Sequence, residues 1–258
     1  MQEAADRLLD AAATGAPCAP LRDLIGTDDV DAAYAVQRRL TAHRTDAGAR
    51  VVGRKIGLTN PAVQAQLGVD SPDFGVLFDD MAVDHDGTVA AGRLLQPRIE
   101  AEVAFVLGAD LDGEITDATV RAAVDHQRAA LEIVDSRIAG WDITFGDTVA
   151  DNGSSGLYVL GPEQVALRTT EPVGVTRTLE RAGGTVSEGT GAACLGDPLA
   201  ALAWLARTAR DLGDPLRAGD VVLSGALGPM VPVEPGDRFT ARITGLGDVA
   251  ITFAKENP

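Results

Sequence analysis

The chain has little of three residue types that many proteins of its size use freely: aromatic residues, cysteine and lysine. Aromatic residues make up 4% of the 258 residues, so the core must consist mainly of alanine, valine and leucine. The two cysteines, Cys18 and Cys194, lie far apart in the sequence and exclude a disulfide-stapled scaffold, which predicts a reducing, cytoplasmic location. Lysine occurs as Lys55 and Lys255 in a chain that otherwise uses arginine.

Basic charge and long apolar runs are also scarce. Lys and Arg total 22 against 38 Asp and Glu, which gives a net charge of −16 and argues against nucleic acid as a partner. No apolar run is long enough to span a bilayer, and the N-terminus lacks the pattern of a signal peptide, so we expect no membrane association. Glycine-rich nucleotide fingerprints and the G-x-S-x-G elbow of hydrolases are absent.

The order of the expected elements predicts an α+β fold with a β-rich core, because strands and helices do not alternate as in a doubly wound sheet. We expect a helical arm over residues 1–48 and a second domain over 49–258. The expected elements are helices over 3–13, 28–43 (capped by Thr27 or Asp28), 60–67, 117–130 and 198–212, strands over 49–56, 96–107, 131–134, 157–160, 173–180, 184–188, 220–224, 237–244 and 248–253, a turn over 71–75, a loop or short strand over 76–80, and a polar loop over 148–155.

Two carboxylates interrupt the apolar strand expected over 96–107. Residues i and i+2 of a strand point to the same face, so Glu100 and Glu102 project together with their Cα atoms about 7 Å apart. Like charges on an apolar face repel each other and are costly to bury, and a bound divalent cation offsets both the repulsion and the burial cost. The alternative is an edge strand whose charged face is solvated.

A third acid would complete an oxygen-rich site of the kind that Mg²⁺ or Mn²⁺ prefers. Glu132 and Asp135, at the end of another apolar run, are both candidates. His85 and His126 have no partner at a metal-ligand spacing, so a zinc site is not expected.

Lys55 and a loop of small residues are the other candidates for chemistry. Lys55 lies between Gly53 and Gly57 in an expected strand, where an ammonium group can bind a carboxylate or transfer a proton. The alternative is a lysine of an edge strand that faces solvent. The loop over 151–156 offers hydroxyl and backbone N–H groups to an anion, although a surface turn has the same composition.

Several segments, in this order, resemble the hydratase/decarboxylase branch of the fumarylacetoacetate hydrolase superfamily. The segments are Val51 to Thr59, Pro72 to Met81, Gln96 to Glu102, Ala130 to Arg137, Asp147 to Asn152, Leu199 to Ala206 and Leu223 to Met230. The resemblance covers the chain from about residue 30 to its end. It departs from the family pattern at Gly153, where alanine is usual, and at Asp197, where histidine is common.

The resemblance implies a rolled mixed β-sheet, a catalytic domain over 49–258 and a bound Mg²⁺ or Mn²⁺. It favours Glu132 over Asp135 as the third ligand. The implied site residues are the metal ligands Glu100, Glu102 and Glu132, the catalytic residues Lys55 and Asp80, and the substrate-binding residues Leu58, Ser154 and Ser224.

The activity implied is hydration of 2-hydroxypenta-2,4-dienoate to 4-hydroxy-2-oxopentanoate, in the catabolism of aromatic compounds. The alternatives are decarboxylation of a 2-oxo-3-hexenedioate, hydrolytic C–C cleavage of an acylpyruvate, and a non-catalytic subunit that binds another enzyme of the pathway. The expected partners are the small dienoate substrate, further copies of this chain, and possible association with another enzyme of the pathway.

Overall fold

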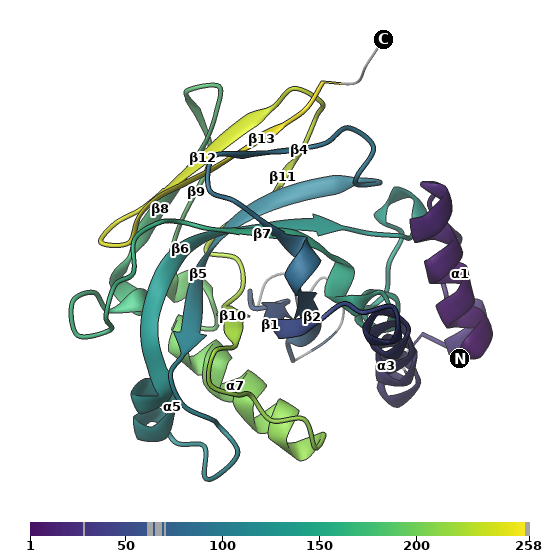
Figure 1. The fold of residues 1–258 in the computed structure, drawn as a ribbon, viewed down its shortest axis with the longest axis horizontal. Helices are drawn as coiled ribbons and strands as arrows, with labels where there is room; N and C mark the ends of the chain where they lie inside the picture. The colour runs from purple at the N-terminus through teal and green to yellow at the C-terminus, as the bar shows by residue number, and fades with distance from the viewer. Residues whose placement is uncertain (28, 61–63, 65–68, 70, 256–258) are drawn as a thin grey trace.

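The computed structural model describes residues 1–27, 29–60, 64, 69 and 71–255. Its first three helices lie on one side of the molecule (Figure 1): α1 Gln2–Thr14, α2 Arg22–Ile25 and α3 Val30–Asp46. The Asp29 carboxylate caps α3 by accepting a hydrogen bond from Ala32 N at 2.9 Å. The second expected helix is therefore confirmed, with Asp29 rather than Thr27 as its cap, and Asp28 lies outside the described residues.

Apolar packing and one buried amide join these helices to the β-rich part of the chain. Leu8 lies in the same hydrophobic cluster as Ile138 and Val149. The side-chain amide of Gln37 donates hydrogen bonds to the carbonyl oxygens of Phe74, at 2.8 Å, and Val149, at 3.0 Å. The third helix is thus fixed to a strand and to a helix of the β-rich part.

The larger sheet is mixed and eight-stranded, with the order β2-β1-β10-β5-β6-β7-β3 and β11 beside β5. The pairs β1/β10 and β3/β7 are parallel, and the other neighbours are antiparallel. The long strands β5 and β6 arc through the middle of the molecule (Figure 1). The strands are β1 Val51–Gly57, β2 Asp73–Phe78, β3 Ala82–Val83, β5 Pro97–Leu107, β6 Val124–Asp135, β7 Ser155–Leu160, β10 Val221–Leu223 and β11 Val231–Pro232.

A second, five-stranded sheet covers one face of the larger sheet, in the order β4-β13-β12-β8-β9. Its strands are β4 Gly87–Val89, β8 Thr176–Arg181, β9 Gly184–Thr190, β12 Arg238–Ile243 and β13 Gly247–Phe253. The main core contains Ile99, Ala101 and Val103 of β5 together with Leu179 and Phe239 of the second sheet. Because side chains alternate along a strand, the even-numbered residues of β5 point away from this core.

The other helices and short 3-10 turns in the described part of the chain connect the strands. They are α5 Asp117–Ala123, α6 Phe145–Ala150, α7 Pro198–Asp211, η1 Asp79–Met81, η2 Ala139–Trp141, η3 Asn152–Ser154, η4 Pro172–Gly174 and η5 Gly191–Ala193. The helix expected over 117–130 is wrong beyond Ala123, because β6 pairs with β5 from Val124 to Asp135. Much of the loop expected over 148–155 belongs to α6 and η3, and β2 begins within the turn expected over 71–75.

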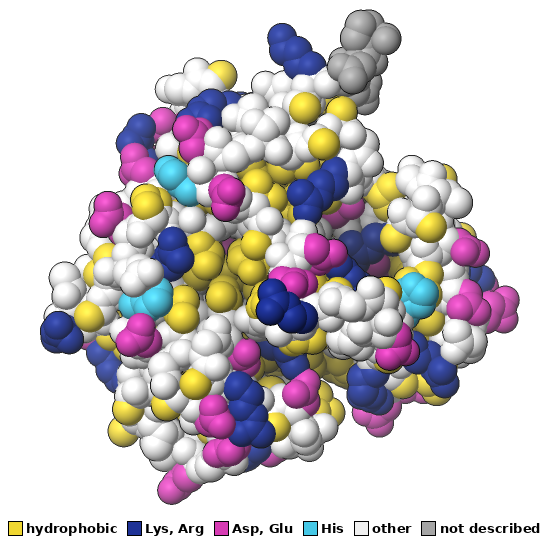
Figure 2. All heavy atoms as spheres, viewed as in Figure 1, with side chains coloured by type: hydrophobic (Ala, Val, Ile, Leu, Met, Phe, Trp, Pro, Cys, Tyr) yellow, Lys and Arg dark blue, Asp and Glu magenta, His cyan; other side chains and the backbone are white. Residues whose placement is uncertain are grey.

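These elements confirm the expected α+β class with mixed sheets and N-terminal helices. Most of the short helix expected over 60–67 lies outside the described residues. No helix in the described part of the chain has the length and apolarity needed to cross a membrane. Side chains of both charge signs are interspersed on the face shown in Figure 2.

Candidate metal centre and active site

Three glutamates meet on the face of the larger sheet that points away from the main core. Glu100 and Glu102 lie on β5, and Glu132 is the direct cross-strand partner of Glu100 on β6. Their exposed fractions are 6%, 0% and 1%. One carboxylate oxygen from each lies within 4.8 Å of the others. The spacing of Glu100 and Glu102 predicts that they share a face of the sheet. The pairing of β6 with β5 places Glu132 beside them.

Burial and mutual repulsion make these carboxylates hard to ionise without a cation. Burial, followed by the charge of Glu132, raises the pKa of Glu100 to about 7. Burial and the charges of Glu132 and Glu100 raise the pKa of Glu102 well above its ordinary value, against a hydrogen bond from Gly225 N at 2.7 Å. Burial also raises the pKa of Glu132, although Lys55 opposes it.

The donor set fits a hard divalent cation. Within the described residues, Glu102 Oε1 and both carboxylate oxygens of Glu132 accept no hydrogen bond of ordinary geometry. Buried acceptors of this kind normally have a partner. A cation such as Mg²⁺ prefers carboxylate oxygens, and its charge would offset both the burial cost and the repulsion.

Lys55 lies beside the glutamates on β1, an interior strand of the same sheet. Its Nζ is 3.3 Å from Glu132 Oε1, and the residue is 3% exposed. Burial alone would lower the pKa of Lys55, but the charges of Glu132, Asp73, Glu100 and Glu102 together raise it above its ordinary value. Lys55 is therefore an ammonium among four buried carboxylates, and not a solvent-facing edge lysine.

Asp73 is the fourth carboxylate, and the sequence analysis missed it. It begins β2, opposite Gly57 of β1, and is 1% exposed. A Cβ on Gly57 would lie 2.0 Å from Asp73 Oδ1, so the glycine makes room for this carboxylate. Burial raises the pKa of Asp73, while Lys55 and a 3.5 Å hydrogen bond from Thr148 Oγ1 oppose the rise. The available signal was an aspartate at the start of an apolar strand.

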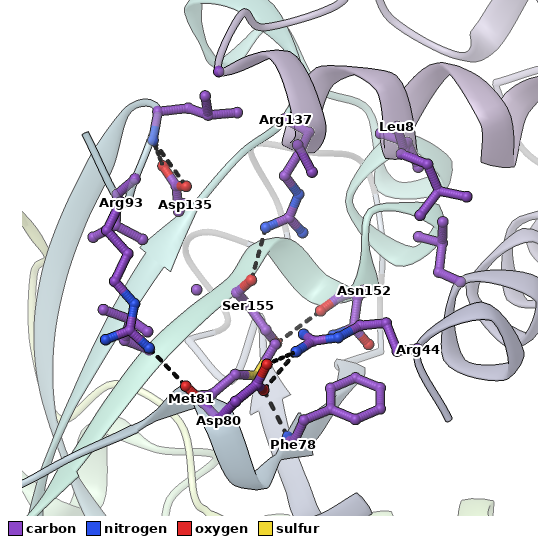
Figure 3. Close-up of a pocket in the computed structure, with 18 of the residues that line it drawn as sticks. Leu8, Arg44, Phe78, Asp80, Met81, Arg93, Asp135, Arg137, Asn152 and Ser155 are labelled. Atoms are coloured by element: carbon purple, nitrogen blue, oxygen red, sulfur yellow. Dashed lines mark hydrogen bonds and ion pairs between the residues drawn. The ribbon is translucent and has the colours of Figure 1, made fainter. Parts of the chain in front are cut away.

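Asp80 does not join this group. It lies in η1, beyond the end of β2 that pairs with Val51, whereas Asp73 lies at the opposite end of that ladder. Its side chain is 60% exposed, and both carboxylate oxygens accept hydrogen bonds from Arg44, at 2.5 and 2.6 Å. Figure 3 shows Asp80 with Arg44 and Arg93 at a separate cavity. This cavity has a volume of 270 Å³, and none of the four buried carboxylates lines it.

The three predicted substrate-binding residues lie at loops around the centre. Ser154 is buried in η3, after Gly153, where an added Cβ would lie 2.6 Å from Lys55 Cε. Ser224 is buried next to Gly225, which donates to Glu102. Leu58 directly follows β1 with a φ of 54°. Leu58 thus follows the strand that carries Lys55, and Ser154 and Ser224 are each next to a glycine that contacts Lys55 or Glu102.

The comparisons with known proteins agree with this geometry. A family model described as fumarylacetoacetate (FAA) hydrolase C-terminal matches residues 35–254. A 2-keto-4-pentenoate hydratase from Paraburkholderia xenovorans is 55% identical over 253 residues, which cover 98% of this chain and 94% of that protein. A 2-hydroxyhexa-2,4-dienoate hydratase from Comamonas testosteroni is 40% identical over 96% of both chains. The 4-oxalocrotonate decarboxylase from Pseudomonas putida G7, complexed with magnesium and adipate, superposes with a TM-score of 0.93 at 32% identity, covering 97% of this chain and 96% of that one.

Proposed function

This chain belongs to the fumarylacetoacetate hydrolase family, and from that premise we propose that it is a hydro-lyase that hydrates 2-hydroxypenta-2,4-dienoate. The product is 4-hydroxy-2-oxopentanoate. The observation that carries the proposal is the buried group of Glu100, Glu102, Glu132, Lys55 and Asp73, in a chain 55% identical to a 2-keto-4-pentenoate hydratase.

In this proposal the three glutamates hold Mg²⁺ or Mn²⁺. The bound cation supplies positive charge that attracts the carboxylate and the neighbouring oxygen of the substrate and stabilises negative charge on that oxygen. Glu102 is held in place by the backbone N–H of Gly225, so its second oxygen remains directed to the group. The neighbouring decarboxylase structures contain magnesium or calcium, which supports a divalent ion.

Lys55 and Asp73 perform the proton transfers. Hydration requires the C2 hydroxyl to lose a proton and C5 to gain one, which gives a 2-oxo-3-pentenoate; water then adds its hydroxyl to C4 and a proton to C3. Lys55 and Asp73 each favour the charged form of the other, so an ammonium that can donate a proton lies near a carboxylate that can accept one. Three of the four carboxylates that raise the pKa of Lys55 are the ones assigned to the cation, so that pKa falls once the cation offsets their charge.

The loops supply the substrate contacts. Ser154 offers a hydroxyl beside the Lys55–Asp73 pair, since its Oγ is 3.5 Å from Thr148 Oγ1, which in turn contacts Asp73. We assign Ser154 and Ser224 to polar groups of the substrate and Leu58 to its apolar end. The same family premise leads us to propose a homo-oligomer in the cytoplasm, which can associate with another pathway enzyme; sedimentation of the purified protein tests the oligomer.

A second candidate is decarboxylation of a 2-oxo-3-hexenedioate. It is favoured by the close superposition on a 4-oxalocrotonate decarboxylase. Both reactions develop negative charge on the same oxygen, so the ligands do not distinguish them. The higher identity to proteins named as hydratases favours hydration.

The test compares Asp73→Asn with Asp80→Asn, two substitutions that make the same chemical change. Decay of the ultraviolet absorbance of 2-hydroxypenta-2,4-dienoate is followed with Mg²⁺, and the product is identified. We expect Asp73→Asn to lower kcat by about 10² to 10⁴, the usual contribution of acid–base catalysis. Asp80→Asn should stay within about twofold, because its side chain is exposed and contacts Arg44. Loss of activity in Asp80→Asn alone would refute the assignment, and CO₂ release from the hexenedioate without hydration would favour the decarboxylase.

A further inference from the structure

Arg177 is a buried cation with too few partners. It lies on β8, is 2% exposed, and has the largest side chain among the fully buried residues described. Its Nη2 donates to the carbonyl oxygen of Pro229 at 3.3 Å, whereas Nε and Nη1 have no hydrogen-bond partner in the described part of the chain. A guanidinium offers five donors, and burying it unsatisfied is costly. The proposed proton transfers and ligands make no use of this residue.

The guanidinium lies next to the segment that borders the glutamates. An added Cβ on Gly228 would be 2.5 Å from Arg177 Nη2, so the two are in close contact. The same segment continues into β11, where Val231 pairs with Ile99, the residue before Glu100. Burial lowers the pKa of Arg177, and Glu100, followed by Glu188, raises it. Glu188 is exposed and screened by solvent, so Glu100 is the buried countercharge.

The sum of the buried charges around the glutamates depends on Arg177. The buried charges here are the four carboxylates around Lys55, Lys55 itself, and Arg177, which is within the influence of Glu100. A divalent ion makes this set neutral, and without Arg177 it would remain negative. An anionic substrate enters a neutral buried site far more readily than a negative one.

We propose that Arg177 is an electrostatic positioning residue that allows the cation-loaded site to accept a carboxylate substrate. The inference rests on the proposed function, which supplies the cation and the anionic 2-oxo or 2-hydroxy acid. It has a consequence that packing alone does not produce. The charge of Arg177 repels the divalent ion and attracts the substrate, so removing it weakens binding of the substrate without weakening binding of the ion.

The test uses Arg177→Met, which has a flexible apolar side chain, and Arg177→Lys, which retains the charge. Calorimetry measures the Kd of Mg²⁺ alone and then the Kd of pyruvate, a simple 2-oxo acid, on the Mg²⁺-loaded protein. For Arg177→Met we expect the Kd of pyruvate to rise about tenfold and the Kd of Mg²⁺ to stay equal or fall. The KM for the dienoate should rise more than kcat falls, and Arg177→Lys should restore most of the pyruvate affinity.

Several results would overturn the proposal. These are a Kd of pyruvate unchanged in Arg177→Met, weakening of Mg²⁺ and pyruvate alike, or no recovery in Arg177→Lys. Should Arg177→Met fail to fold, Arg177→Gln makes the same charge change and keeps a polar group toward Pro229. Both binding measurements proceed without turnover, so a wild-type protein that binds normally but does not hydrate the dienoate refutes the proposed function alone.

Discussion

Raising the pH of the metal-free protein should destabilise it, because of the buried carboxylates. Glu100 has a pKa of about 7 when folded, against an ordinary value of 4.5. A carboxyl whose folded pKa is raised stabilises the protein fully below its unfolded pKa and loses that contribution as the pH rises through the folded one. Converted at about 1.4 kcal/mol per pH unit, the difference amounts to about 3 kcal/mol of unfolding free energy between about pH 4.5 and about pH 7.

Urea unfolding from about pH 5 to about pH 8, with a chelator present, measures this effect. The wild type is compared with Glu100→Gln, which cannot titrate, and with Glu163→Gln, which removes an exposed carboxylate as a control. We expect the stability of the wild type relative to Glu100→Gln to fall by about 3 kcal/mol across this range. Saturating Mg²⁺ should reverse the trend, since the cation competes with the protons. A difference that stays flat or rises with pH in the metal-free protein would refute the reasoning.

Three other changes test different contacts. Gln37→Leu leaves the carbonyl oxygens of Phe74 and Val149 without their donor, so urea unfolding should show a loss of about 2 kcal/mol or more. Arg137→Met removes the cation that pairs with the buried carboxylate of Asp151, 2.5 Å from Arg137 Nε, and should cost about 3–5 kcal/mol in the same assay. Near-wild-type stability would contradict this expectation. Lys55→Met should lower kcat by about 10² to 10⁴ while calorimetry still detects Mg²⁺ binding, because the three glutamates remain.

The paired glutamates illustrate what a sequence can predict here. Strand periodicity alone places Glu100 and Glu102 on one face, and the structure confirms that strand. Nothing local distinguishes Glu132 from Asp135, because the choice depends on which residue β6 sets opposite Glu100. The family resemblance favoured Glu132, whereas Asp135 accepts hydrogen bonds from the backbone of Leu95 and Gln96.

Long-range pairing explains the remaining differences. Ser71 and Pro72 before Asp73 favour a turn, yet pairing with β1 draws Asp73 into a strand beside Lys55. The first residues of β6 have a helix-like composition, and pairing with β5 overrides it. Asp80 occupies a short acidic turn, and its partner Arg44 lies 36 residues earlier, so no local pattern predicts this pair.

The bond between Gln37 and the carbonyl oxygens of Phe74 and Val149 constrains how this chain can be recombined with its relatives. A chimera joined after residue 48 would take Gln37 from one parent and both of its acceptors from the other. The acceptor residue Phe74 directly follows Asp73, and the acceptor residue Val149 directly follows Thr148, which donates to Asp73. A poor fit between Gln37 and these acceptors would therefore displace residues of the proposed proton transfer. Chimeras that take residues 30–46, 73–78 and 145–150 from a single parent should therefore retain more activity than chimeras joined after residue 48.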